Sequence, residues 1–249
     1  MPSLQQTLHK VEGLLYSARM KRFHVITIFP DIVTAYAGES IVARAVKDKL
    51  IAIKAYNPRD FLRGKSKNGY RPVDDRPYGG GPGMVLAADP VVRAIDRALS
   101  AARKGKRKTK VIILSPQGKE FTNAYAERLV KRYDDVVFVA GRYEGIDARV
   151  KTIFRAEEVS TGPYVLTGGE LPALTMIDAM TRRIPGVLGK FESLEESRTA
   201  SPDVYTRPEV YEWKGKKYRV PKVLRSGDHK KIDAWKETRI AMRKKKKGE

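Results

Sequence analysis

The sequence predicts an α/β fold with a mostly parallel sheet. Short runs of β-branched and aromatic residues alternate with longer stretches whose apolar residues recur at helical spacing, and this alternation is typical of parallel α/β domains. The longest apolar runs, such as residues 136–140, have the length of strands, and none approaches the roughly 18 apolar residues of a membrane span. We therefore expect a cytoplasmic protein of one or two globular domains, with no segment that spans a membrane.

Five strands are expected from the distribution of β-branched and aromatic residues. The first, FHVITIF, stops at Pro30, and the others are bounded by polar or glycine-containing segments. The expected strands are residues 23–29, 51–56, 110–114, 136–140 and 155–160.

Helices are expected between these strands, where apolar residues recur every three or four positions. One start is well marked, because Asp89 is followed by Pro90, which suits an N-cap with proline at the first helical position. The expected helices are residues 40–50, 89–102, 122–132, 146–152 and 170–183.

The composition changes near Gly189. Residues 190–204 hold few large apolar side chains and resemble a linker, and the last 45 residues carry 16 Lys and Arg against 6 Asp and Glu. Residues 1–19 have helical spacing with few acids, which suits a surface helix or upstream start better than a targeting peptide. The expected organisation is an N-terminal extension (1–19), an α/β domain (20–188), a linker (189–204) and a small basic domain (205–249).

The charge and the missing cysteines limit the possible chemistry. The net charge of +21 favours a polyanionic partner, either nucleic acid or an acidic membrane surface. The absence of cysteine excludes disulfides, thiolate metal sites and a cysteine nucleophile. Because His9, His24 and His229 lie far apart in the sequence, we expect no histidine metal site either.

Glycine-rich turns follow several of the expected strands. They lie in the segments 74–84, 114–118 and 164–172, and a fourth segment, GRYEGID (141–147), adds a carboxylate and an aromatic ring after a strand. Glycines let a backbone approach a ligand closely, and open α/β sheets bind ligands beyond the carboxyl ends of their strands. Each turn alone could be a simple tight turn, and the residues of GRYEGID could form only a local salt bridge, but together they favour a composite ligand site.

Six segments occur in one order along the chain: DDRPYGGGPGM, LSPQGK, GRYEGID, YVLTGGELPA, IDAMTRRIPGVLG and YTRPEV. Together they closely resemble the bacterial tRNA (guanine-N1)-methyltransferases of the TrmD type, in the SPOUT superfamily. The resemblance extends from about residue 20 to residue 235.

The resemblance implies a fold, a reaction and partners. The fold is an α/β domain with a trefoil knot, joined by a linker to a small helical domain. The reaction transfers a methyl group from S-adenosyl-L-methionine to N1 of guanine 37 of tRNA, and the enzyme is a homodimer whose active sites use both chains. The resemblance also leaves open a contribution of Mg²⁺ to the reaction, and it assigns no residue as a metal ligand.

The resemblance also implies site residues. Arg182 matches the catalytic arginine, which stabilises charge on the base, and Glu196 is the best match to the carboxylate that removes the N1 proton. The cofactor-binding residues fall in three loops: Leu114, Ser115, Pro116 and Gly118; Gly141, Tyr143 and Glu144; Ser160, Thr161, Gly162, Tyr164, Leu166, Gly168, Gly169 and Pro172. The segment 74–83 is expected near the cofactor and the target base.

Two departures from the family pattern leave alternatives open. Pro163 stands where the family usually has Asp, and the linker has Glu195-Glu196-Ser197-Arg198 where an Asp-Ser-Phe run is typical. The alternatives are a non-catalytic RNA-binding relative and a methyltransferase of ribosomal RNA. Trp213 and Trp235 are expected to anchor the core of the small domain rather than to stack on bases, and the basic C-terminal end is expected to bind phosphates.

Overall fold

The computed structural model describes residues 19–62, 72–188 and 203–247. The chain divides into two compact units, Met1–Gly189 and Lys190–Glu249.

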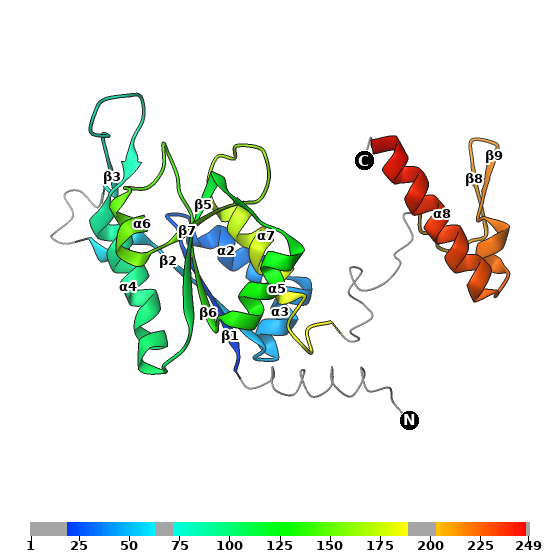
Figure 1. The fold of residues 1–249 in the computed structure, drawn as a ribbon, viewed down its shortest axis with the longest axis horizontal. Helices are drawn as coiled ribbons and strands as arrows, with labels where there is room; N and C mark the ends of the chain where they lie inside the picture. Colours follow the sequence, from blue (N-terminus) through cyan, green and yellow to red (C-terminus); the bar gives the residue numbers. More distant parts are fainter. Residues whose placement is uncertain (1–18, 63–71, 189–202, 248–249) are drawn as a thin grey trace. The chain divides into compact units, whose positions relative to one another are not determined.

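The first unit is built on one five-stranded parallel sheet (Figure 1). The strand order is β2-β1-β6-β5-β7. The strands are β1 (Lys21–Ile26), β2 (Ile51–Tyr56), β5 (Thr109–Glu120), β6 (Asp135–Val139) and β7 (Glu157–Ser160). The mostly parallel α/β fold predicted from the sequence is therefore confirmed.

Helices cover both faces of the sheet (Figure 1). One face carries α2 (Pro30–Ala37), α3 (Ser40–Lys47), α5 (Asn123–Arg132) and α7 (Glu170–Thr181), and the other carries α4 (Ala88–Lys104) and α6 (Arg149–Phe154). Because side chains alternate along a strand, β6 sends Val136 and Phe138 into one core and Val137 and Val139 into the other. Two hydrophobic layers thus hold the sheet in the middle of the unit.

Two of the expected strands differ clearly from those of the structure. The first strand ends at Ile26, and Pro30 begins helix α2 instead of merely ending a strand, because proline is well suited to the first helical turn. Strand β5 continues to Glu120, and its register with β7 shifts between Leu114 and Lys119. Residues 115–118 therefore interrupt the pairing of β5 with β7, and the pairing resumes at Lys119. The sequence alone indicates a turn that ends the strand.

The glycine-rich segment 74–84 begins with the short strand β3 (Asp74–Asp75) and leads into β4 (Val85–Leu86), which pairs antiparallel with β3. Gly79, Gly80, Gly81 and Gly83 all have positive φ values, which L-residues with side chains rarely adopt. The glycines therefore permit the shape of this connection.

The second unit contains a hairpin as well as helices. Strands β8 (Val210–Trp213) and β9 (Lys216–Arg219) pair antiparallel and are followed by a short 3₁₀ helix, η4 (Lys222–Arg225), and by α8 (His229–Lys247). The small helical domain implied by the family resemblance thus also includes a two-stranded sheet. None of the residues 203–242 is fully buried.

Candidate active site

A cavity of about 550 Å³ lies where the carboxyl ends of the parallel strands meet. It is lined by the segments that follow β6 and β7 and by the looped-out residues of β5. Thirteen of the fifteen cofactor-binding residues expected from the sequence line it: Leu114, Ser115, Pro116, Gly141, Tyr143, Glu144, Ser160, Thr161, Tyr164, Leu166, Gly168, Gly169 and Pro172. Three segments that are distant in the sequence are therefore brought together around one volume.

Gly118 and Gly162 are the two expected residues that do not line the cavity. A Cβ atom on Gly118 would lie 2.4 Å from the backbone nitrogen of Val159, so this glycine lets β5 pass close to β7. A Cβ atom on Gly162 would lie 2.4 Å from the ring of Tyr164. Both glycines therefore permit close packing next to the residues that line the cavity.

A buried hydrogen-bond network supports the cavity at the start of α7. The buried Glu170 accepts a hydrogen bond of 2.7 Å from Thr27 Oγ1 and one of 3.0 Å from Arg142 Nε. Arg142 also donates to the carbonyl of Thr167 over 3.1 Å, and its guanidinium lies 4.5 Å from the ring centroid of Phe29. This network links the ends of β1 and β6 to α7.

The sequence does not mark Arg142 as a site residue. The alternative interpretation of GRYEGID is that Arg142 forms a salt bridge with Glu144 or Asp147. The structure pairs it with Glu170 instead, while Asp147 pairs with Arg149. Both Arg142 and Asp147 line the cavity. The position of Arg142 inside GRYEGID was the available signal, but its partner lies 28 residues away in the sequence.

The cavity offers both aromatic and anionic surface. Tyr143 and Tyr164 are exposed beside it, and Tyr143 is therefore not packed in the core. The hydrogen bonds from Arg149, opposed by partial burial, hold the pKa of Asp147 below its usual value, and Glu158 pairs with Lys151. Among the described residues, none forms an ion pair with Glu144. Within the described part of the chain, Glu144 is thus the one carboxylate of the cavity that has no cationic partner.

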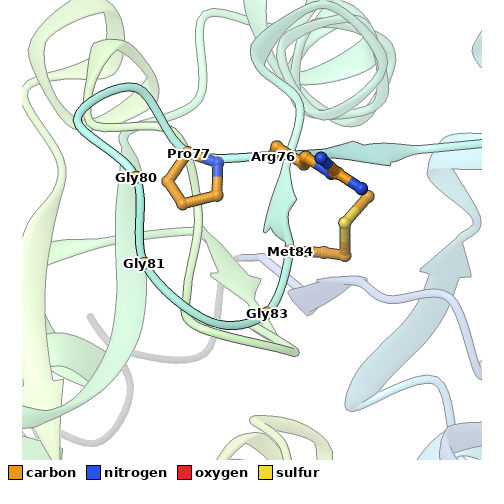
Figure 2. A pocket seen from close by; sticks show the side chains of 6 residues that line it. All are labelled: Arg76, Pro77, Gly80, Gly81, Gly83 and Met84. Atoms are coloured by element: carbon orange, nitrogen blue, oxygen red, sulfur yellow. The ribbon is translucent and has the colours of Figure 1, made fainter.

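The glycine-rich segment 74–84 forms an open arch next to this cavity. A second hollow of about 510 Å³ is lined by Arg76, Pro77, Gly80, Gly81, Gly83 and Met84 (Figure 2). The arch is tied to the cavity by hydrogen bonds of 3.0 Å from the Glu144 N–H to the Met84 carbonyl and from the Leu86 N–H to the Gly145 carbonyl. A Cβ atom on Gly83 would lie 2.8 Å from Cγ of Glu144, so the arch passes directly over that side chain.

The two expected catalytic residues are not both placed by the structure. Arg182 follows the last residue of α7, and its N–H donates to the Asp178 carbonyl over 3.1 Å. It does not line the cavity of its own chain. Glu196 lies outside the described residues, as do Glu195 and the rest of the linker.

In the ranges 19–62, 72–188 and 203–247, no three His, Asp or Glu side chains gather as ligands for a metal ion. Within the same part of the chain, no helix combines the length and the apolar character needed to cross a bilayer.

Comparison with known proteins decides the family. Residues 20–248 match the family model described as tRNA (Guanine-1)-methyltransferase TrmD. The chain belongs to this family. The enzyme class predicted from the sequence, a tRNA (guanine-N1)-methyltransferase, is thereby confirmed.

Individual relatives agree with this assignment. The chain is 46% identical over 225 residues to a tRNA (guanine-N(1)-)-methyltransferase of Psychromonas ingrahamii, with 89% of this chain and 87% of the relative covered. It is 44% identical to one of Buchnera aphidicola, with 88% and 90% covered. A crystal structure of tRNA (m1G37) methyltransferase from Aquifex aeolicus superposes with a TM-score of 0.74 at 35% identity, covering 93% of this chain and 94% of that one. The SPOUT fold class expected from the sequence is that of this TrmD structure.

Proposed function

We propose that this TrmD family member transfers the methyl group of S-adenosyl-L-methionine to N1 of guanine 37 in tRNA, in the cytoplasm. The observation that carries the proposal is the cavity at the strand ends, which gathers the three family loops around one volume. The crystal structure from Aquifex aeolicus that it resembles is that of a tRNA (m1G37) methyltransferase, which supports position 37 here as well.

The chemistry of the cavity fits the proposed methyl donor. Tyr143 and Tyr164 offer apolar ring surface for a purine, and Glu144 offers negative charge for a cationic ligand. S-adenosyl-L-methionine supplies a methyl group on a positively charged sulfur, which is a good leaving group without any metal. The volume of about 550 Å³ falls within the range of about 300–1,000 Å³ that is common for small-molecule sites.

The residues of this chain have to supply a base and a cation. N1 of guanine carries a proton and becomes nucleophilic when a positioned carboxylate removes it, and we assign that role to Glu196. Negative charge then develops on the exocyclic oxygen of the base, where Arg182 stabilises it. The target base has to leave its stack to reach the site. We assign no magnesium site, and a contribution of Mg²⁺ is tested by measuring methyl transfer with and without the ion.

We further propose that the enzyme acts as a homodimer, since Arg182 does not line the cavity of its own chain. An exposed apolar face supports this proposal. Phe29, which immediately precedes α2, and Ile32 and Tyr36 on α2 are spaced at three and four residues, and all three are exposed. Leu171 on α7 is also exposed, and Tyr36 donates a hydrogen bond of 2.5 Å to Asp178 of that helix. Sedimentation of a fully active monomer would contradict the dimer.

The domain organisation completes the proposal. We assign residues 20–188 to the methyltransferase domain, 189–204 to the linker and 205–249 to tRNA binding, with 1–19 as an extension. The division of the chain into compact units after Gly189 supports the end of the methyltransferase domain near residue 188.

One experiment tests the activity directly. A tRNA transcript with guanine at position 37 should accept a methyl group from S-adenosyl-L-methionine, and the same transcript with adenine at 37 should not. Binding of both cofactor and tRNA without transfer to either transcript would favour the non-catalytic RNA-binding alternative, which the departure at Glu196 keeps open. Methylation of ribosomal RNA with none of tRNA would favour the other alternative.

A further inference from the structure

The hairpin of β8 and β9 presents an aromatic face. Residues directly opposite in an antiparallel pair lie on the same side of the sheet, and Tyr211 is opposite Tyr218 while Trp213 is opposite Lys216. Since side chains alternate along each strand, these four residues share one face. Glu212 and Lys217 are opposite each other on the other face.

The three rings of this face are largely exposed. Tyr211 and Trp213 are each 57% exposed and Tyr218 is 49% exposed. The sequence expectation that Trp213 anchors the core of the small domain is therefore wrong. Three neighbouring exposed rings form an apolar surface of a kind that marks interaction sites on soluble proteins.

Lysines accompany the rings on this face. Lys216 Nζ lies 5.5 Å from the ring centroid of Tyr218, and Lys214 Nζ at the turn lies 5.9 Å from that of Trp213. Among the residues that the structure describes, no carboxylate forms an ion pair with either lysine. The acid of the hairpin, Glu212, is on the other face, 3.9 Å from Lys217. The aromatic face therefore combines flat rings with uncompensated positive charge.

We propose that the face formed by Tyr211, Trp213, Lys216 and Tyr218, with Lys214 at its edge, binds unpaired nucleotides of the tRNA substrate. Flat rings stack on bases whatever their sequence, and lysines attract the adjoining phosphates. Paired bases hide their ring faces inside the helix, whereas bases of loops and bulges expose them for stacking. An apolar protein partner would leave the lysines without counter-charges. The inference rests on the proposed function in so far as that function makes tRNA the ligand.

The test compares variants by tRNA affinity at several salt concentrations. Trp213→Ala should weaken binding of the transcript about ten-fold at every salt concentration, since the substitution removes a ring and no charge. Trp213→Phe should restore most of the affinity because a ring remains. Lys216→Gln should weaken binding and lower the slope of log affinity against log salt by about 0.7–0.9. Lys217→Gln is the matched control of equal charge change on the other face, and it should have little effect.

Two controls keep the outcomes separate. Circular dichroism and affinity for S-adenosyl-L-methionine should be the same in all variants, which shows that the fold is intact. If Trp213→Ala binds the transcript as wild type does, the proposal is overturned even when the wild type methylates guanine 37. If Trp213→Ala changes sedimentation and not tRNA affinity, the face belongs to a contact between copies and the proposal is likewise overturned. If the wild type methylates no transcript, the proposed function fails, while the comparison of binding still decides the role of the face.

Discussion

Gly169 is a position where the backbone leaves no room for a side chain. A Cβ atom there would lie 2.6 Å from Cα of Ala140, and the Gly169 N–H donates to the Gly141 carbonyl over 3.0 Å. The close approach brings the start of α7 against the end of β6, at the wall of the cavity. We expect Gly169→Ala to lower the free energy of unfolding by about 1–3 kcal/mol, as overpacking does, and to weaken cofactor binding.

Gly38→Ala is the matched control for this substitution. Its Cβ atom would meet only the Ala35 and Thr34 carbonyl oxygens at ordinary distances of 3.5 and 3.6 Å, and its φ of −81° suits alanine. Urea unfolding and calorimetric titration with S-adenosyl-L-methionine should show a near-neutral effect for Gly38→Ala. Equal effects of the two substitutions would contradict the packing argument.

Arg182 tests the proposed charge stabilisation. Replacement by alanine should lower single-turnover methyl transfer by about 10²–10³, the scale observed when one donor to a developing oxyanion is removed. Cofactor binding should persist, because the proposed contact of Arg182 is with the exocyclic oxygen of the guanine and not with the methyl donor. The adjacent Arg183→Ala is the control of equal charge change. Unchanged turnover in Arg182→Ala would remove this residue from the mechanism.

Glu196 tests the proposed base. Glu196→Gln keeps the size and hydrogen-bonding capacity of the side chain but removes its basicity, so methyl transfer should fall by roughly 10²–10⁴ while tRNA and cofactor still bind. Glu196→Asp should retain part of the activity. The adjacent Glu195→Gln is the comparison, and a full rate in Glu196→Gln with an inactive Glu195→Gln would move the base by one residue.

At the scale of elements, Asp135 joins the amino ends of the central strands. It is the first residue of β6 and is 0% exposed. Its carboxylate accepts hydrogen bonds of 2.5 Å from Arg22 Nε and 3.0 Å from His24 Nε2, both on β1, and another from Arg107, which precedes β5. Burial raises the pKa of Asp135, but these hydrogen bonds outweigh it and lower the pKa from 3.8 to about 2.

This lowered pKa predicts a loss of stability in acid. Because the folded-state pKa lies below the ordinary value, the ionised carboxyl stabilises the fold above about pH 4, and the contribution of about 2 kcal/mol is lost as the pH falls towards 2. Asp135→Asn should be less stable at pH 7, since it leaves two arginines without their partner, and its stability should change less between pH 4 and pH 2. Thermal unfolding across this range measures both effects.

Glu127→Gln is the control for the acid experiment. Its carboxylate pairs with Lys131 on an exposed helix surface, where ion pairs contribute little. Its stability should follow that of the wild type from pH 7 to pH 2. An Asp135→Asn curve parallel to the wild-type curve would show that Asp135 does not titrate with folding.

Local patterns explain which elements could be predicted from the sequence. Ile51–Tyr56 is the strand predicted, because its β-branched residues carry the signal within six positions. The continuation of β5 depends on pairing of Lys119 and Glu120 with Val159 and Ser160, about 40 residues later, so no local pattern indicates it. The hairpin had a signal that was missed: Lys214-Gly215 separates two strands by two residues, and both have positive φ values of 49° and 72°, as two-residue hairpin turns require.

The candidate site divides in the same way. The loops could be predicted because their residues are contiguous in motifs, and thirteen of them line one cavity. The pairing of Arg142 with Glu170 could not be predicted from the sequence, because it depends on the end of β6 and the start of α7 lying close together in space. Gly118 and Gly162 belong to the same motifs, but they pack closely against neighbouring residues and do not line the cavity. A motif alone therefore does not show which of its residues line a ligand site and which only permit close packing.

At the scale of the whole molecule, charge is distributed unevenly. The net charge is +21, and the last 45 residues contribute +10 of it. The second unit has no fully buried residue among 203–242, so little of its sequence serves a core of its own. A small unit of this kind is suited to presenting side chains to a large partner, and its charge suits a polyanion.

The charge predicts how binding depends on salt. Each phosphate neutralised by Lys or Arg releases counterions, so the logarithm of tRNA affinity should fall linearly with the logarithm of salt concentration. Deleting residues 243–249, which hold Arg243 and four lysines, should reduce the slope by about 0.7–0.9 for each phosphate that these cations neutralise. Affinity should fall similarly for every tRNA, because phosphate contacts carry no sequence information, and cofactor affinity should stay the same.

Filter binding at four or more salt concentrations measures the slope of log affinity against log salt. Replacement of the five cations by glutamine preserves the chain length and therefore separates the effect of charge from that of length. An unaltered slope in both variants would mean that this end of the chain carries only solvated charge and that the phosphate contacts are made elsewhere.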